Sequence, residues 1–503
     1  MNTNSSTSLK RISLYGTALS VLAASGVLVR LLEYSRNRSF WLDEIMLALN
    51  VLQKSFTSLV LTPLDYDQAA PLGFLVLAKA AVAVAGNSEY AFRAVPLIAG
   101  LLSFFVFYKL CASCRLARPA TVLAMFFFMT SLELIRYATE FKQYSCEALF
   151  FMATLVMGIA MAGKKIDLRN SLFLGAAGAV LLWFSFCTLF ALAALGTVLL
   201  GACLIEKRWD ELKAISVSFA CWGASFITLY FFWLKNIAGN PTLEQYWTNS
   251  YMPLPLFSVT TLLWAMKRLV GMFYFTRGGL GARTAALFFL AGSVLLLRRN
   301  PKQALLLILP LVFAFLVSSV HKYPVEGRQV LFYVPVLYLL MSEGLASLLQ
   351  SRYKAVRAAG IVFVILIARA PTADFLKEYS HSVVYTEDIK SVLDHIQKNM
   401  KERDIIYDCY GADFALRYYG HRYGLTGNII HGIHSEDDRQ KYLLDADKLK
   451  GNPRVWIIFS HITTERTKAE EEYILDHVKR TGKVLDRIES EGAAAYLVDL
   501  SGS

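Results

Sequence analysis

Long stretches without charge dominate the first three quarters of the chain. The clearest runs from Ser171 to Ile205, thirty-five residues without a charged side chain. As one helix it would be about 52 Å long at about 1.5 Å per residue, whereas the apolar core of a bilayer is about 30 Å thick. The stretch therefore predicts two membrane-spanning helices joined by a tight turn near Phe184 and Ser185.

Applied to the whole chain, the same reasoning predicts about eleven spans, because a crossing helix needs about 20 apolar residues. The predicted spans are residues 12–32, 94–110, 119–135, 144–162, 170–186, 187–205, 213–234, 281–297, 303–320, 329–349 and 356–371. We expect the first of them to be retained rather than removed as a signal peptide, since no clear small-residue cleavage site follows it.

The basic residues between the spans predict the orientation of the chain. Six clusters fall on the same side of the membrane: Lys10/Arg11, Lys109/Arg115/Arg118, Lys164/Lys165/Arg169, Lys207/Arg208/Lys213, Arg298/Arg299/Lys302 and Arg352/Lys354/Arg357. By the positive-inside rule this side is the cytoplasm. We therefore predict a multi-pass protein of the inner (plasma) membrane, with a cytoplasmic N-terminus and a periplasmic or extracellular C-terminus.

Two further apolar segments do not count as spans. Pro71–Gly86 is short and contains Lys79, and Leu256–Phe275 carries Lys267 and Arg268 near its middle. Counting either one as a span would move the later basic clusters to the outside. We predict that both are helices in the outer interface, with their cations extended towards the headgroups. The first of them lies in a large first external loop, residues 33–93.

From Thr372 onward the pattern is that of a soluble domain. Thr386–Glu402 has apolar residues at helical spacing, and Thr464–Thr481 indicates another helix. The predicted strands are Asp404–Tyr410, Arg454–Ser460, Lys483–Glu489 and Ala493–Leu500. The fold class is then an α-helical polytopic membrane protein, residues 1–371, with a C-terminal external α/β domain, residues 372–503. In that domain His421, His431 and His434 are loosely grouped and could bind a metal, although ordinary surface histidines explain them more simply.

Composition narrows the class of protein. Hydrophobic residues make up 55% of the chain and charged residues only 18%, which excludes an ordinary soluble protein. The net charge of +12 resides largely in the clusters between spans, so it indicates membrane topology and contact with membrane lipids rather than binding to nucleic acid. The seven cysteines include one CxxC, Cys111 and Cys114, with no partner pair, so we predict neither a disulfide framework nor a metal site from them.

The charged residues that do not belong to the basic clusters gather at the predicted external face. They are Asp43-Glu44 after the first span, Asp65 and Asp67, Glu89 and Arg93, then Arg136, Glu140, Lys142 and Glu147, and finally His321, Lys322 and Arg328. Ionisable groups near a membrane are costly and usually functional. A transporter would place its site near the midplane and often on broken helices of two repeats, and the sequence shows neither feature.

In the order and spacing of four of these segments, the chain resembles the GT-C membrane glycosyltransferases. The segments are Asp43-Glu44, the Pro71-Leu72 opening of an interfacial helix, residues 86–96 with Glu89 and Arg93, and residues 136–144 with Arg136, Glu140 and Lys142. The resemblance is greatest to the bacterial branch that contains aminoarabinose transferase and the Rhizobium galacturonosyl transferases, related to protein O-mannosyltransferases of glycosyltransferase family 39. It covers residues 1 to about 160 well, weakens in the middle and says little about residues 372–503.

The resemblance implies a polyprenyl-phosphate sugar donor and an inverting, single-displacement transfer to a hydroxyl of a glycan, lipid or protein. A carboxylate takes the proton of the acceptor while cations stabilise the departing lipid phosphate. On this basis Asp43 is the expected general base, with Glu44 and Glu140 as further acidic groups. The expected phosphate-binding residues are Arg136, Lys142, His321, Lys322 and Arg328, with Lys267-Arg268 as the alternative place.

Several alternatives stay open at this point. Asp43 could merely cap a helix that begins near Ile45, and Glu140 could form a salt bridge with Arg136 or Lys142. The sequence requires no metal or other cofactor, but a divalent cation could be held by Asp43, Asp67 and Glu140. Ala69-Ala70-Pro71 replaces the His-Pro-Pro of protein O-mannosyltransferases, and the Trp-Trp-Asp of oligosaccharyltransferases is missing. Both departures count against a protein acceptor. The rival functions are a transporter or flippase of envelope glycolipids and a membrane anchor for the external domain.

Overall fold

The protein folds into two compact units. The computed structural model describes residues 3–273, 279–380, 387–433 and 440–502. One unit, which we call the membrane unit, comprises residues 1–35 and 56–381. The other, the sheet unit, comprises residues 36–55 and 382–503.

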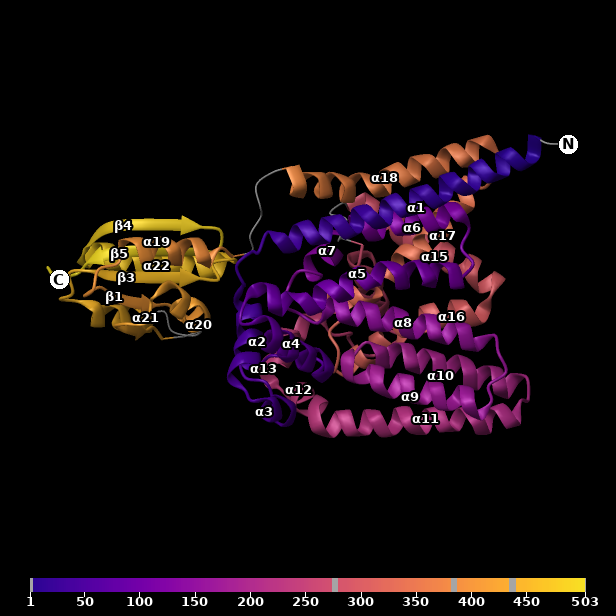
Figure 1. Ribbon diagram of the computed structural model, residues 1–503, viewed down its shortest axis with the longest axis horizontal. Helices are drawn as coiled ribbons and strands as arrows, with labels where there is room; N and C mark the ends of the chain where they lie inside the picture. Colours follow the sequence, from indigo (N-terminus) through magenta and orange to yellow (C-terminus); the bar gives the residue numbers. More distant parts are fainter. Residues whose placement is uncertain (1–2, 274–278, 381–386, 434–439, 503) are drawn as a thin grey trace. The chain divides into compact units, whose positions relative to one another are not determined.

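The membrane unit is a multi-pass helical bundle (Figure 1). Among the described residues, nine helical stretches are long and apolar enough to cross a membrane. They are α1 (Thr3–Ser35), α5 (Glu89–Ser113), α8 (Tyr144–Ala162), α10 (Thr188–Ile205), α11 (Trp209–Leu229) with η1 (Tyr230–Leu234) and α12 (Lys235–Ala238), α15 (Gly279–Arg299), α16 (Pro301–Ser319), η4 (Gly327–Tyr333) with α17 (Val334–Leu349), and α18 (Lys354–Ser380). The two remaining predicted spans correspond to shorter apolar helices, α6 (Arg118–Thr130) and α9 (Leu168–Phe184).

Helix α17 lies at the centre of the bundle, packed mainly against α15 and α6, and every residue from Val334 to Ala346 is buried. Two glycines let α15 and α17 approach closely. A Cβ on Gly292 would lie 1.8 Å from the Leu340 carbonyl oxygen, and one on Gly344 would lie 2.3 Å from that of Phe288. Small residues at such a crossing are the usual means of packing helices in a membrane. Helices α1 and α18 meet near their C-terminal ends, where the Tyr379 hydroxyl donates to Glu33 over 3.4 Å.

The turns and short helices follow the sequence prediction with one difference. Helix α9 ends at Phe184 and α10 begins at Thr188, as the charge-free stretch predicted. The two segments predicted to be interfacial are helices, α4 (Leu72–Ala85) and α14 (Val259–Gly271). The predicted span 119–135, however, is interrupted at Ser131, whose backbone is extended, and continues as the short helix α7 (Leu132–Tyr137). Three more short helices are α3 (Phe56–Leu61), α13 (Pro241–Tyr246) and η2 (Thr248–Ser250).

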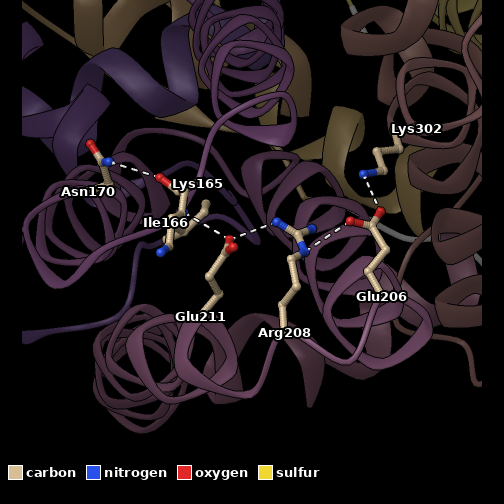
Figure 2. A network of polar contacts seen from close by, with 7 residues as sticks. All are labelled: Lys165, Ile166, Asn170, Glu206, Arg208, Glu211 and Lys302. Atoms are coloured by element: carbon tan, nitrogen blue, oxygen red, sulfur yellow. Dashed lines mark hydrogen bonds and ion pairs between the residues drawn. The ribbon is translucent and has the colours of Figure 1, made fainter.

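Three of the predicted cytoplasmic clusters meet in one polar network (Figure 2). Arg208 lies 2.8 Å from Glu211 and 3.0 Å from Glu206, and Lys302 lies 2.8 Å from Glu206. The Ile166 amide donates to Glu211 over 3.0 Å, and the Lys302 ammonium lowers the pKa of Glu206. The α8–α9, α10–α11 and α15–α16 turns therefore share one face of the bundle, as their common predicted side requires.

The sheet unit contains a five-stranded sheet in the order β2-β1-β3-β5-β4. The strands are β1 (Ile405–Asp408), β2 (Ile429–His431), β3 (Val455–Ser460), β4 (Lys483–Ser490) and β5 (Ala493–Asp499). Strands β2, β1 and β3 are parallel, while β5 is antiparallel to both β3 and β4. The helices are α19 (Ile389–Asn399), α20 (Tyr410–Tyr419), η5 (Gly420–Tyr423), α21 (Gln440–Ala446), η6 (Asp447–Leu449) and α22 (Glu465–Thr481). The four predicted strands and two predicted helices are present, whereas β2, α20 and α21 were not predicted.

The boundary between the units differs from a single division at residue 371. Helix α18 continues to Ser380, so the apolar run that ends near residue 371 does not mark the end of the helix. Residues 36–55, which include α2 (Leu42–Gln53), belong to the same compact unit as the sheet. The segment that carries Asp43 and Glu44 is therefore part of the sheet unit.

Candidate functional site

The turn between α7 and α8 is polar yet almost completely buried. We call residues 136–144 the polar turn. Its side chains Glu140, Lys142 and Gln143 are only 4–5% exposed. The backbone is held locally, since the Thr139 amide donates to the Arg136 carbonyl over 2.9 Å and the Lys142 amide to the Glu140 carbonyl over 2.7 Å. Charged groups are rarely buried so fully unless their surroundings compensate them.

Arg136 is surrounded by carboxylates. Burial alone would lower the pKa of its guanidinium, but Glu140 first, then Glu133 and Glu378, outweigh burial and raise the pKa above its usual value. Arg136 therefore stays positively charged. Glu140 is the carboxylate that acts most strongly on it, which places the predicted acidic group and the predicted phosphate-binding group next to each other.

Lys142 joins the polar turn to the segment just before α4. Its ammonium donates to the Gln68 side-chain oxygen over 2.8 Å, and Gln143 donates to the Ala69 carbonyl over 3.2 Å. Gln68 also lines a cavity of about 60 Å³ together with Trp233 and residues of α12 and α13. Asp67, of the Asp65-Tyr66-Asp67 motif, is exposed and accepts a 2.7 Å hydrogen bond from Asn240.

Arg328 comes from a distant part of the chain to the same turn. Its guanidinium lies 5.8 Å from the centre of the Tyr144 ring, and the rings of Tyr137 and Tyr144 are 5.0 Å apart, edge to face. Burial and the charge of Glu140 raise the pKa of the Tyr137 hydroxyl well above its usual value, and Arg328 opposes them. The structure thus brings Arg136, Glu140, Lys142 and Arg328 together around the polar turn.

His321 and Lys322 have other partners. Both side chains are exposed. Lys322 donates to the Ala238 carbonyl over 2.9 Å, and the His321 ring stacks on Tyr251 at 4.7 Å and lies 3.5 Å from Glu244. These contacts attach the two residues to the segment that contains α12 and α13.

The alternative cation Arg268 is also engaged elsewhere. It lies 2.5 Å from Glu326 and donates to the Asn249 carbonyl over 2.5 Å. Although burial raises the pKa of Glu326, hydrogen bonds from Ser250 and Arg268 lower it below its usual value, so the pair stays ionised. The positive charge of Arg268 is therefore compensated by Glu326.

Asp43 and Glu44 belong to the first turn of α2 in the sheet unit. Helix α2 begins at Leu42 with Trp41 as its N-cap, and the amides of Glu44 and Ile45 donate to the Trp41 carbonyl. Asp43 therefore does not occupy the N-cap, and the alternative that it caps a helix starting near Ile45 is wrong. The Asp43 side chain is partly exposed, whereas Glu44 is 1% exposed. Negative charge in the first turn is favoured by the helix dipole.

A group of potential metal ligands in the sheet unit was only partly anticipated. His431 Nδ1 lies 2.9 Å from Asp408 and 3.3 Å from Asp413, at the carboxyl ends of β1 and β2. The buried Asp408 has a pKa raised by burial to about 6, with His431 opposing the rise. Asp413 is also bound by Arg417 over 2.7 Å. The predicted neighbour His434 lies outside the described residues. The available signal was an aspartate within a predicted buried strand, Asp408, which is the last residue of β1.

A charged residue inside the first span was missed altogether. Arg30 is 1% exposed, its guanidinium lies 4.6 Å from the centre of the Phe104 ring and 5.6 Å from that of Phe128, and it donates to the Gly26 carbonyl over 3.2 Å. Stacking on aromatic faces stabilises a buried cation. The signal was present in the sequence, because an arginine within an apolar span is rare.

Comparison with known proteins identifies the fold. No protein-family model and no curated protein matches the sequence. Among solved structures, ArnT from Cupriavidus metallidurans bound to undecaprenyl phosphate matches with a TM-score of 0.50 and 13% identity over 95% of this chain and 97% of that chain. Apo ArnT matches with a TM-score of 0.51 and 12% identity over 98% of both chains. The Archaeoglobus fulgidus oligosaccharyltransferase in complex with zinc and sulfate matches with a TM-score of 0.53 and 12% identity over 95% of this chain and 72% of that chain.

Identities this low carry information about the fold alone. The chain has the GT-C fold, a multi-pass helical bundle with a small sheet unit, as the resemblance at the sequence level implied.

Proposed function

We propose that this protein is an inverting glycosyltransferase that moves a sugar from a polyprenyl phosphate to an acceptor hydroxyl at the external membrane face. The observation that carries the proposal is the end-to-end match of the fold to ArnT, a protein whose structure was solved with undecaprenyl phosphate. The polar turn of the membrane unit adds chemistry suited to such a donor. The sugar and the acceptor are left open.

The leaving group of this reaction is an anion, and the membrane unit offers cations for it. When the bond between the anomeric carbon and the phosphate oxygen breaks, both electrons remain on the lipid phosphate. Arg136 stays charged because of its carboxylate neighbours, Arg328 lies over Tyr144, and Lys142 donates to the neutral Gln68. Fixed donors in a dry site stabilise such an anion more than water does. We rank these three residues ahead of His321 and Lys322.

The acceptor must lose a proton as its oxygen attacks the anomeric carbon. We assign this proton to the Asp43 carboxylate, which is partly exposed at the start of α2 and so accessible to an acceptor from water. Glu44 and Glu140 are both buried. We assign Glu44 to positioning of the acceptor and Glu140 to the balance of charge around Arg136. A single displacement of this kind inverts the anomeric carbon.

The proposed placement in the cell follows from the basic clusters. We propose an inner-membrane protein whose network of Lys302, Arg208 and their glutamates faces the cytoplasm and whose external domain, including residues 387–503, faces outside. Single cysteines introduced at Lys302 and at Lys398 in a cysteine-free chain test this with a membrane-impermeant maleimide on intact cells. Labelling at Lys398 alone is expected, and labelling at Lys302 alone would reverse the orientation.

The function is tested with the purified protein in lipid vesicles and a panel of radiolabelled polyprenyl-phosphate sugars. Release of the lipid phosphate together with transfer of the label to an acceptor supports the proposal. The rival flippase would move an intact donor between leaflets without breaking the sugar–phosphate bond. Donor that crosses the membrane uncleaved, with every sugar and acceptor of the panel, would therefore favour the flippase and contradict the transferase.

A further inference from the structure

The segment directly before α2 is held by the sheet unit. We call Arg36–Trp41 the strap. Phe40 lies at its centre, is fully buried, and its amide donates a 2.9 Å hydrogen bond to the hydroxyl oxygen of Tyr419 at the end of α20. Tyr419 is also fully buried, and the ring of its neighbour Tyr418 lies 5.2 Å from the Phe40 ring. An irregular segment needs such partners, because a buried amide without one is costly.

The strap is also bound at both of its ends. On one side of Phe40, the Ser39 hydroxyl donates to Asp388 over 3.1 Å and Lys390 donates to the Asn37 carbonyl over 2.6 Å. On the other side, the Trp41 ring stacks on the ring of His461 with a centroid separation of 6.2 Å. These partners come from the start of α19, the end of α20 and the residue after β3, three separate elements of the sheet unit.

The strap leads directly into α2. Trp41 is both the last residue of the strap and the N-cap whose carbonyl accepts the first amides of α2. Asp43 follows two residues later. The position of its carboxylate is therefore fixed by where the sheet unit holds Phe40 and Trp41.

We propose that the sheet unit positions the general base, with Tyr419 as the main positioning residue acting through Phe40. This inference rests on the proposed function, because it gives the external domain a role in the same reaction. The structural reason is that a general base works only within hydrogen-bond reach of its proton, and a displacement of about 1 Å costs about 10²-fold in rate. Donor binding is assigned to residues of the membrane unit, so it does not depend on the strap.

The test compares two variants that each remove one buried tyrosine hydroxyl from the sheet unit. Tyr419→Phe removes the oxygen that accepts from Phe40. Tyr407→Phe is the matched control, because Tyr407 is 1% exposed and its hydroxyl donates to Asp445 over 2.7 Å, away from the strap. We expect Tyr419→Phe to lower kcat by about 10²-fold with the KM for donor unchanged. Tyr407→Phe should keep the kcat of the wild type.

A double mutant separates positioning from general damage. If Tyr419 acts through Asp43, then Tyr419→Phe costs little further activity once Asp43→Asn is present, because groups that act as one unit are not additive. Equal losses in both backgrounds, or equal losses for Tyr419→Phe and Tyr407→Phe, would overturn the inference. Should Tyr419→Phe fail to fold, His461→Ala replaces it, since that side chain is 29% exposed. The same drop in kcat at constant KM is then expected, and wild-type kcat would overturn the inference.

The same experiments distinguish a failure of the proposed function from a failure of the inference about the sheet unit. If no donor is cleaved by the wild type, the transferase itself is wrong. If Asp43→Asn is active, the base assignment is wrong. If Asp43→Asn is inactive while Tyr419→Phe retains full kcat, only the role of the sheet unit is wrong.

Discussion

Lys142 and Gln68 are separated by 74 residues in sequence, yet the lysine ammonium lies 2.8 Å from the glutamine side-chain oxygen. This bond joins the segment just before α4 to the polar turn. In the sequence the two segments are separate, one marked by the acidic motif before the Pro71 helix and the other by its charged residues. Their contact makes them one structure, so a donor bound at the polar turn would also meet the first loop.

The bond gives a first prediction, because its two partners can be removed one at a time. Lys142→Met removes the positive charge, and we expect kcat to fall by about 10²-fold, as for one donor to a developing oxyanion. Gln68→Met breaks the same hydrogen bond but leaves the ammonium in place, so its loss should be several times smaller. Both are measured by steady-state transfer at saturating acceptor. Equal losses for the two variants would mean that Lys142 serves only to hold the loop.

A second prediction ranks the phosphate-binding residues. Arg136→Gln and Arg328→Gln should each raise the KM for donor or lower kcat by at least about tenfold, or about 1.4 kcal/mol, because each removes a charge at the polar turn. His321→Gln is the control, since that exposed side chain contacts Tyr251 and Glu244 instead. Its donor kinetics should match the wild type. A larger defect in His321→Gln than in either arginine variant would move the phosphate site to the α12–α13 segment.

A third prediction concerns the pH dependence of stability in the sheet unit. Burial raises the pKa of Asp408 from 3.8 to about 6. Between these values the folded chain holds a proton that the unfolded chain has released, so the contribution of Asp408 to stability falls as the pH rises through this window. The difference corresponds to about 3 kcal/mol at neutral pH. Asp408→Asn does not titrate, so its Tm in the presence of EDTA should fall less than that of the wild type between pH 4 and 7.

Asp404 serves as a control, because its pKa is shifted in the opposite direction to that of Asp408. Burial would raise its pKa, but hydrogen bonds from Arg454, the Lys401 amide and Trp456 outweigh burial and lower it. Asp404 therefore stabilises the fold at neutral pH and loses this contribution as the pH falls through its lowered pKa. Asp404→Asn should destabilise the chain mainly at neutral pH. If Asp408→Asn and Asp404→Asn change the pH slope in the same direction, the assignment of the Asp408 pKa is wrong.

The membrane-spanning helices could be predicted from the sequence because the thickness of the bilayer directly sets the length of the apolar run that each one needs. Even the turn between α9 and α10 follows from length alone. The break at Ser131 did not, because the sequence around it, Met129-Thr130-Ser131-Leu132, contains no glycine or proline to predict a helix end. Arg136, Glu140 and Lys142 could be selected as neighbours because they share one turn. Their contacts with Gln68 and Arg328 depend on tertiary packing.

The same limit explains what was missed in the sheet unit. His431 faces Asp408 because β1 and β2 are paired in one register, and a three-residue strand gives almost no periodic signal. The strap was assigned to the membrane part because it follows the first span directly in sequence. Phe40 of the strap and its partner Tyr419 are 379 residues apart in sequence, and no local sequence pattern predicts such a contact.

Asp43→Asn is the most direct test of whether Asp43 takes the proton of the acceptor. Asparagine keeps the shape of the side chain but cannot accept a proton at neutral pH, and Asp43 is not the N-cap of α2, so helix capping is unaffected. Asp67→Asn, the same change at an exposed aspartate of the first loop, serves as the control. We expect a loss of about 10²–10⁴-fold in transfer by Asp43→Asn, with donor binding retained and with Asp67→Asn close to the wild type. Near-wild-type transfer by well-folded Asp43→Asn would contradict it.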